Sequence, residues 1–258
     1  MTFKYELSDK VKKFIENSNL KEISIGCSDS QVVEIIKDEK KYFLKIAKEG
    51  LLTSEYKKLD WLKGKLYVPN VELYDNYNGI EYLITTSVNG EMVCSDYYIN
   101  NPELGLKVIA DSFENIYSVN IDNCPFNVDI DYKLKLVENN VKNKLVTNND
   151  LKDTTLEKFR TVENLLKYLK DNRINEEKCF SHGDTSLPNI FASKDKFEGF
   201  IDVGECGIAD KWFDLAICEK SIIRNYGQEY VERFYEQLNI VPDRNKIDYY
   251  LYMMELYL

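Results

Sequence analysis

The chain has 258 residues, of which 44% are hydrophobic and 30% charged, as is typical of one large globular domain or two small ones. A formal net charge of −10 disfavours nucleic acid as a partner, since nucleic-acid binding requires a basic surface, and suits a cationic partner better. No run of about 18 apolar residues is present, so we expect no membrane span, and the N-terminal residues lack the apolar core of a signal peptide.

Six cysteines are present, and no pair has the C-x-x-C spacing of many zinc and redox sites. We therefore expect free thiols in a reduced, cytoplasmic protein. Nothing in the sequence requires a dimer, and we expect a monomer.

The first third of the chain is expected to be rich in β-strands. Ser8 is placed to cap a short helix in which Val11 and Phe14 share one face. Alternating patterns and turn residues then predict five strands with one helix among them. The strands cover residues 22–26, 31–37, 41–47, 71–76 and 80–86, and the helix covers residues 52–63.

After Asn89-Gly90 the pattern changes to long amphipathic helices, interrupted by a β-hairpin near residues 189–202. The helices are expected at residues 102–119, 130–146, 159–172, 210–224, 228–238 and 244–257. Strands with one helix, followed mainly by helices, predict an α+β fold with a β-rich lobe at 1–88 and a mainly helical lobe at 89–258. The hinge falls at residues 86–90, and a cleft between two lobes is a natural ligand site.

The most informative segment is residues 179–218, which contains the predicted hairpin. If its turn is centred on Asp195-Lys196, residues whose numbers add up to 391 face each other, and Asn189 and Asp202 form such a pair. Opposite residues of an antiparallel pair have Cβ atoms about 5 Å apart on one face of the sheet. An amide oxygen and a carboxylate are hard oxygen ligands of the kind that Mg²⁺ prefers. We therefore predict a magnesium site at Asn189 and Asp202.

Asp184 lies five residues before Asn189, on the loop that enters the hairpin. A carboxylate beside a metal-bound triphosphate can accept the proton of an attacking hydroxyl, and phosphoryl transfer otherwise requires positioning and charge neutralisation. Lys45, in an apolar strand pattern, is the expected cation, with Glu55 on the next helix as its partner. Phe43 shares the face of Lys45 and is placed either to stack on a nucleobase or to pack in the core.

Each of these residues also has a purely structural interpretation. Asp and Asn favour turns, so Asp184 taken alone is weak evidence for a functional site. His182, the only histidine, is expected to be a structural hydrogen-bonding residue. Asp210 is expected to cap a helix, and Asp214 to support the site from behind. The joint spacing of three residues at the hairpin favours the functional interpretation.

These motifs resemble the aminoglycoside phosphotransferase family, and most closely its 3′-phosphotransferases. The family motif H-G-D-x-x-x-x-N is matched by His182-Gly183-Asp184-Thr185-Ser186-Leu187-Pro188-Asn189, and a later family block is matched by residues 199–204 and 209–216. The similarity extends over nearly the whole chain. It implies a two-lobed, protein-kinase-like fold that uses ATP or GTP as the phosphate donor.

The resemblance also implies a role for each matched residue. Asp184 is the catalytic base, and Asn189 and Asp202 are the Mg²⁺ ligands. The Lys45–Glu55 ion pair holds the phosphates of the nucleotide. The resemblance also implies nucleotide contacts at Ser28, in a loop that replaces a glycine-rich phosphate loop, and at Thr86 and Val88, in the hinge that meets adenine. Phe43 is added to these predicted contacts because it shares the strand face of Lys45.

The chain departs from the family pattern on the acceptor side. Glu205 stands where close relatives usually carry Arg near the reacting phosphate, and Lys220 stands where Arg is common. The loop at residues 148–157 resembles the one that binds antibiotic amines, but it is less acidic than in active relatives. The resemblance assigns Asp150, Asp153, Glu157 and Glu255 to substrate binding. We add Glu205 to the predicted substrate-binding residues, because an acid in place of the Arg is expected to alter the pose of the substrate.

Three functions compete. The first is an aminoglycoside O-phosphotransferase that acts on the 3′-hydroxyl and gives antibiotic resistance. The second is a related kinase for a different alcohol, such as a choline-like amine, a macrolide or a metabolite, and the departures at the acceptor side favour it. The third is a non-catalytic nucleotide-binding protein with a kinase fold, which would have no need of Asp184.

Overall fold

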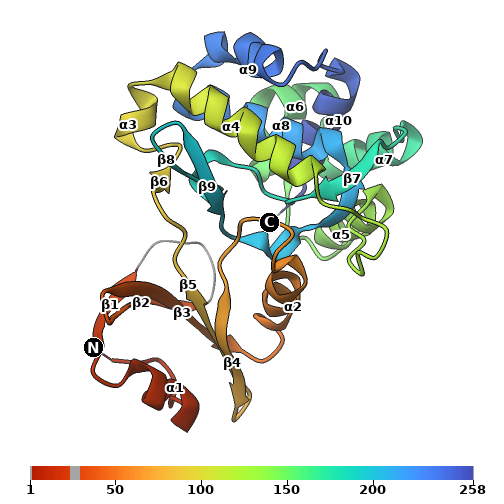
Figure 1. The fold of residues 1–258 in the computed structure, drawn as a ribbon. Coiled ribbons are helices and arrows are strands. Elements are labelled where there is room, and N and C mark those ends of the chain that lie inside the picture. Colours follow the sequence, from red (N-terminus) through yellow and green to blue (C-terminus); the bar gives the residue numbers. More distant parts are fainter. Residues whose placement is uncertain (1, 24–29, 258) are drawn as a thin grey trace. The chain divides into compact units, whose positions relative to one another are not determined.

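The computed structural model describes residues 2–23 and 30–257 (Figure 1). The chain forms two compact units. The first comprises Met1–Glu91, Phe191–Ser193 and Glu198–Gly204, and the second comprises Met92–Ile190, Lys194–Phe197 and Glu205–Leu258. The functional division into lobes at residues 1–88 and 89–258 stays a prediction.

The first unit is built on an antiparallel sheet of five strands in the order β1-β2-β3-β5-β4. Its strands are β1 (Asn19–Ile23), β2 (Gln31–Lys37), β3 (Lys40–Lys48), β4 (Val71–Tyr77) and β5 (Ile80–Thr86). All five correspond to predicted strands. The first begins three residues earlier than predicted, because Asn19 already pairs with Ile36, and its predicted end at residues 24–26 lies outside the described residues.

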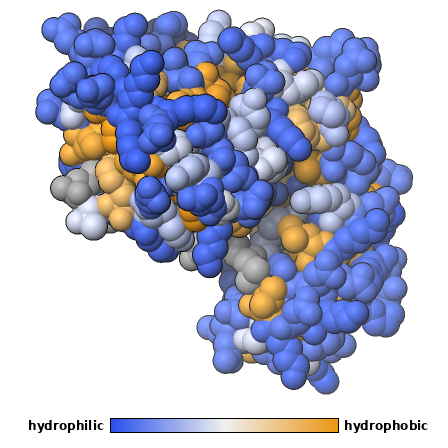
Figure 2. All heavy atoms as spheres, turned by 90° about the horizontal axis from the view of Figure 1, so that it is seen from below, coloured by the Kyte–Doolittle hydropathy of each residue, from blue (hydrophilic) through white to orange (hydrophobic). Residues whose placement is uncertain are grey.

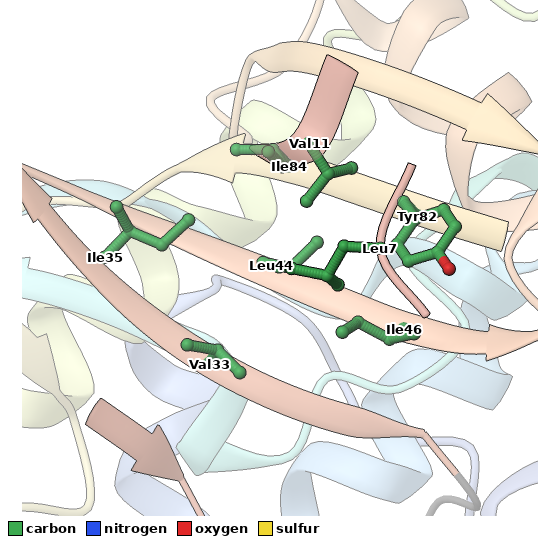
Figure 3. Close-up of a cluster of buried hydrophobic side chains, with 8 residues drawn as sticks. All are labelled: Leu7, Val11, Val33, Ile35, Leu44, Ile46, Tyr82 and Ile84. Carbon is green, nitrogen blue, oxygen red and sulfur yellow. The ribbon is translucent and has the colours of Figure 1, made fainter. Parts of the chain in front are cut away.

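One face of this sheet packs against α1 (Asp9–Ile15) around a buried hydrophobic cluster (Figure 3). The cluster consists of Leu7, Val11, Val33, Ile35, Leu44, Ile46, Tyr82 and Ile84. Ser8 caps α1 as predicted, with its Oγ accepting a hydrogen bond from the N–H of Val11 at 3.3 Å. Because side chains alternate along a strand, placing Leu44 and Ile46 in the cluster sends Phe43 and Lys45 to the opposite face.

A buried carboxylate fixes the start of α2 (Thr53–Leu62). Glu81 of β5 accepts hydrogen bonds from the N–H of Leu52 at 2.6 Å, the N–H of Thr53 at 3.1 Å and the hydroxyl of Tyr74 at 2.6 Å. Burial raises the pKa of Glu81, but these bonds and that of the Thr53 hydroxyl outweigh it and leave the pKa lowered. A charged cap at the helix N-terminus also suits the helix dipole, so the position of α2 is firmly set.

The predicted hairpin is present in a second sheet, in the order β6 (Glu91–Met92), β8 (Ile190–Ser193) and β9 (Lys196–Phe200). The residues between its strands are Lys194 and Asp195, and Lys194 has φ +56°. The predicted centre at Asp195-Lys196 is therefore wrong by one residue. A two-residue turn places opposite each other residues whose numbers add up to 389, not 391, so the predicted facing of Asn189 and Asp202 does not follow from the register.

The second unit is mainly helical. Its helices are α3 (Asp96–Ile99), α4 (Pro102–Tyr117), α5 (Ile130–Lys142), α6 (Asp153–Phe159), α7 (Val162–Asp171), α8 (Lys211–Asn225), α9 (Val231–Gln237) and α10 (Arg244–Met254). The helix predicted at residues 159–172 begins later than predicted, at Val162. Residue 159 belongs instead to the end of α6, which stops at the left-handed Arg160 (φ +70°). The antiparallel pair β7 (Lys178–Ser181) and β10 (Gly207–Asp210) was not predicted.

Aromatic side chains fill the interior of the second unit. Phe113 packs on Phe234, and Phe213 packs on Tyr250, at centroid distances of 5.8 and 5.4 Å. Asp210 caps α8 as predicted, since its carboxylate accepts a hydrogen bond from the N–H of Trp212 at 3.4 Å. The core therefore holds α8 in place, and α8 in turn carries the residues that anchor the candidate site.

Hydrophilic residues cover most of the face drawn in Figure 2, with hydrophobic residues in separate groups among them. Among the described residues, no helix is both long and apolar enough to cross a membrane.

An ion-pair network at Glu177, before β7, predicts a loss of stability in acid. Lys211, Lys246 and the Trp212 N–H bond its carboxylate and lower the pKa of Glu177 to about 2. A carboxylate with a lowered folded-state pKa stabilises the fold above its unfolded pKa of about 4.3, and this stabilisation is lost as the pH falls toward 2. In urea unfolding at pH 7 and pH 3, Glu177→Gln should show a smaller pH dependence than the wild type.

The matched control is Glu163→Gln, at an exposed glutamate of α7. This variant should keep the pH dependence of the wild type. If the free energy of unfolding depends equally on pH in all three proteins, Glu177 does not cause the loss of stability in acid.

Candidate active site

The loop from His182 to Asn189 connects β7 to β8, and Asp214 of α8 holds it from behind. The Asp214 carboxylate accepts hydrogen bonds from Ser181 Oγ at 3.0 Å, His182 N at 2.8 Å and Gly183 N at 3.0 Å. The side chain is buried; burial raises the pKa of Asp214, and the nearby His182 and these hydrogen bonds oppose that rise. Asp214 therefore supports the loop from behind, as predicted.

A second residue of α8 anchors the far end of the same loop. Ser221 Oγ accepts a hydrogen bond from Leu187 N at 2.9 Å, and Thr185 Oγ1 donates to the backbone oxygen of Asp214 at 2.6 Å. Residues 214 and 221 are seven apart, which puts them two turns apart on one helix face. Both ends of the loop are thus fixed to the same rigid element.

Gly183 allows the loop to pass close to a neighbouring segment. It has φ +87°, and a Cβ at this position would lie only 2.4 Å from the backbone oxygen of Glu205. Only glycine fits, so the backbone of Glu205 packs directly against the residue before Asp184. His182, fully buried, accepts a hydrogen bond from Asp184 N through Nδ1 at 3.2 Å, which agrees with the structural role expected for it.

Asp184 and Asn189 are brought together as the motif predicts. Asn189 Nδ2 donates to Asp184 Oδ2 at 2.8 Å and to the Asp184 backbone oxygen at 3.0 Å. Ser186 N donates to Asp184 Oδ1 at 3.2 Å. Each carboxylate oxygen thus has a donor that fixes its direction, and the Asn189 amide nitrogen is committed to Asp184, which leaves its Oδ1 as the atom suited to a cation.

The predicted Lys45–Glu55 ion pair is present in the first unit. Lys45 Nζ lies 2.7 Å from Glu55 Oε1 and 2.9 Å from Glu55 Oε2, and the two side chains are 29% and 13% exposed. The pair is therefore partly shielded from water, and Lys45, the more exposed of the two, can still reach a phosphate. Phe43 lies on the same strand face and is half-buried, outside the hydrophobic cluster.

Asp202 follows β9 in the first unit and has a left-handed backbone, with φ +59°. Its side chain is exposed, and Oδ1 lies 3.9 Å from where a Cβ on Gly204 would be. The backbone oxygen of Gly204 accepts a hydrogen bond from Lys58 Nζ of α2. Asp202 and Gly204 thus belong to one tight turn that α2 contacts.

The donor set expected for Mg²⁺ fits the residues present. Asn189 offers an amide oxygen, and Asp202 offers an exposed carboxylate that can turn toward a cation. Asn189 lies in the second unit and Asp202 in the first, so their joint coordination of one ion stays a proposal.

The other residues predicted to contact nucleotide lie in different parts of the first unit or outside the described residues. Thr86 ends β5, and its N–H and hydroxyl are bonded to the backbone of Asn70. Val88 lies in the predicted hinge, where its Cγ1 is 3.1 Å from the position of a Cβ on Gly199. Ser28 lies outside the described residues.

Four of the five acids predicted to bind substrate stand at or near α6. Asp153 and Glu157 are exposed one turn apart on the helix. Asp150 is exposed and bonds the N–H and hydroxyl of Thr147, at 2.7 and 2.8 Å. Glu255, from the C-terminal end, joins them by accepting hydrogen bonds from Lys152 N and Thr155 Oγ1, both at 2.9 Å.

Cations also lie on this side of the second unit. Burial lowers the pKa of Lys220, and the charges of Lys152 and Arg224 lower it further, while Glu255 and Asp184 oppose them. Glu205, the fifth predicted acid, is exposed and close enough to Tyr132 for its charge to raise the pKa of that phenol, after the larger effect of burial. The acceptor side is therefore of mixed charge.

Comparison with known proteins identifies the family. Residues 19–250 match the sequence profile described as the Phosphotransferase enzyme family. The chain belongs to this family. Two similar proteins are the aminoglycoside 3′-phosphotransferases of Enterococcus faecalis and Staphylococcus aureus, each 33% identical over 98% of this chain and 99% of the relative.

Solved structures confirm the fold predicted for this phosphotransferase. An aminoglycoside-3′-phosphotransferase of type VIII superimposes with a TM-score of 0.81 at 22% identity, over 96% of this chain and 97% of that one. An aminoglycoside phosphotransferase of Streptomyces rimosus, in complex with ADP and streptomycin, gives a TM-score of 0.75 at 20% identity, over 96% of both chains. The prediction of an α+β, protein-kinase-like fold is confirmed.

Three polar residues that position the candidate site of this phosphotransferase were not predicted from the sequence: Lys58, Glu81 and Ser221. One signal was available for Lys58, since it stands three residues after Glu55 and directly before the apolar Leu59. A lysine on the apolar side of a helix requires a partner. The bonds of Glu81 and Ser221 join residues about thirty positions apart, and no local sequence pattern predicts them.

Proposed function

We propose that this phosphotransferase moves the γ-phosphate of ATP or GTP to a hydroxyl of an aminoglycoside, the 3′-hydroxyl, and thereby gives antibiotic resistance. The observation that carries the proposal is the fixed Asp184 carboxylate, held by Asn189 and Ser186 on a loop anchored at both ends to α8. The relatives at 33% identity are aminoglycoside 3′-phosphotransferases, which supports the acceptor and the hydroxyl.

In the proposed reaction, Asp184 accepts the proton of the attacking hydroxyl. Its orientation is set before substrate arrives, because both carboxylate oxygens already have donors. Lys45, held by Glu55, binds nucleotide phosphates by charge. Mg²⁺, held by Asn189 and Asp202, would neutralise phosphate charge. The ADP bound to the Streptomyces rimosus neighbour supports a nucleotide as the donor.

The acceptor side suits a polycation. Asp153 and Glu157 present two carboxylates one turn apart, and Asp150 adds a third nearby in sequence. Carboxylates bind ammonium groups by charge-assisted hydrogen bonds, and each exposed pair contributes modestly, so several are needed together. We further propose that the enzyme acts as a monomer in the cytoplasm, where nucleoside triphosphates are available.

The deciding experiment is a phosphate-transfer assay with purified protein, Mg·ATP or Mg·GTP, and a panel that includes kanamycin, neomycin and a 3′-deoxy aminoglycoside. We expect turnover of kanamycin and neomycin and none of the 3′-deoxy compound. Turnover of the 3′-deoxy compound would overturn the choice of hydroxyl, and no turnover of any aminoglycoside would overturn the acceptor.

A second candidate is a kinase for a different small alcohol. It is favoured by Glu205, one of the departures from the family pattern given in the sequence analysis, and by the cations Lys152, Lys220 and Arg224 on the acceptor side. The variant Glu205→Arg separates the two candidates. A sharp gain in kanamycin turnover would show that the acceptor side of the wild type has changed, whereas efficient turnover by the wild type removes the reason for the second candidate.

A further inference from the structure

Lys58 is a buried lysine that the proposed reaction does not use. It lies on α2, one turn after Glu55, and only 6% of the residue is exposed. Residues three apart share one side of a helix. A buried ammonium group is costly unless its donors are satisfied, so its partners show what it is for.

One partner of Lys58 lies 146 residues away, on the turn that contains Asp202. Lys58 Nζ donates a hydrogen bond to the backbone oxygen of Gly204. A bond from an ammonium group to a carbonyl is charge-assisted and stronger than a neutral one. Gly204 is two residues after Asp202, and a Cβ on Gly204 would lie 3.9 Å from Asp202 Oδ1, so the bond to Gly204 restrains the turn that carries this carboxylate.

The turn requires such a restraint. Asp202 is exposed and has a left-handed backbone, with φ +59°, which costs free energy in a residue other than glycine. A conformation of this kind persists only when neighbouring groups hold it. The Lys58 bond supplies a fixed point from α2, a helix whose own start is set by Glu81.

We propose that Lys58 is a positioning residue that fixes the Asp202 turn for Mg²⁺–nucleotide binding, and that α2 thereby sets two parts of the site at once. Through Glu55 the helix orients Lys45, and through Lys58 it orients the turn of Asp202. The inference rests on the proposed role of Asp202 as a metal ligand. It assigns to this chain a contact between helix and metal-binding turn that the motif residues alone do not predict.

The test uses Lys58→Met, which keeps the length of the side chain and removes its charge. Met fills a similar volume, and the Gly204 carbonyl that loses its donor costs about 1–3 kcal/mol, which is less than the stability of a typical domain, so the variant is expected to fold. Lys58→Arg keeps a donor, and Lys57→Met is the matched control at an exposed neighbour on the same helix. Unfolding in urea confirms that all variants are folded.

The first readout is amide hydrogen exchange of the ligand-free protein. In Lys58→Met, exchange should become at least fivefold faster at residues 202–205 and remain unchanged in β2, β3 and β5. The second is the affinity for ADP with and without Mg²⁺, by calorimetry. We expect about a tenfold loss for Mg·ADP and little change for ADP alone, with partial recovery in Lys58→Arg.

The third readout is the Mg²⁺ concentration that gives half-maximal kcat, which should rise while the KM for the acceptor stays the same. Exchange and Mg·ADP affinity equal to those of Lys57→Met would overturn the proposal. An equal loss of affinity for ADP with and without Mg²⁺ would also overturn it, because that is the result expected if Lys58 only stabilises the fold. If no aminoglycoside is a substrate, the first two readouts still decide the role of Lys58, so the two proposals fail separately.

Discussion

Replacing Asp184 with alanine should lower kcat by about 10²- to 10⁴-fold, because general-base catalysis contributes a factor of this size. The affinity for nucleotide should change little, since Asp184 is assigned to the acceptor hydroxyl. The measurements are steady-state kinetics with the best acceptor and calorimetry with Mg·ADP. Stability should also change little, because Asp184 is only half-buried and Asn189 Nδ2 keeps its hydrogen bonds to the backbone oxygen of residue 184 and to Ser186 Oγ, at 3.0 and 3.3 Å.

The control for this prediction is Asp195→Ala, at an exposed aspartate in the hairpin turn of the same segment. It should leave kcat unchanged. Activity of Asp184→Ala within threefold of the wild type would place the base elsewhere. Loss of Mg·ADP binding with normal chemistry at saturating nucleotide would assign Asp184 to the metal instead.

The substitution Asp214→Asn should lower both the free energy of unfolding and kcat. Asp214 accepts three hydrogen bonds with its two oxygens, and an amide has one oxygen, so its NH₂ group would face an N–H or O–H donor. An unsatisfied buried donor costs about 1–3 kcal/mol, and we expect about 3 kcal/mol in total. Urea unfolding measures this loss.

A displaced loop should reduce kcat more than it changes the KM for nucleotide, because the loop carries Asp184. Asp248→Asn, at an exposed aspartate of α10, provides the same change of charge without the buried contacts and should match the wild type. Unchanged unfolding in Asp214→Asn would show that the three hydrogen bonds do not anchor the loop.

Elements with a long and regular pattern could be predicted from the sequence. The helix at α4 and the strands at β2 and β3 fall within two residues of the predicted ranges. The short pair β7 and β10 was missed, because four residues give too few alternations to show a period. The split between α6 and α7 depends on the left-handed Arg160, and arginine gives no local signal for that conformation.

The candidate site was predictable in its residue types but not in its geometry. The motif spacing brought Asp184 and Asn189 together correctly, because both lie on one short loop. The magnesium pair was argued from a hairpin register, which fails because Lys194 rather than Asp195 begins the turn. A shift of one residue in a turn changes every pairing in the hairpin, and propensities do not resolve it.

The loop that carries the base and the acids proposed to meet the acceptor differ in how they are supported. Asp214 and Ser221 are buried in the core of the second unit, whereas Asp153 and Glu157 are exposed on a seven-residue helix. Surface substitutions usually change stability by less than about 0.5 kcal/mol. Mutations at these exposed acids can therefore accumulate without unfolding the protein or displacing the catalytic loop. Such mutations would let this enzyme evolve to accept more or different drugs.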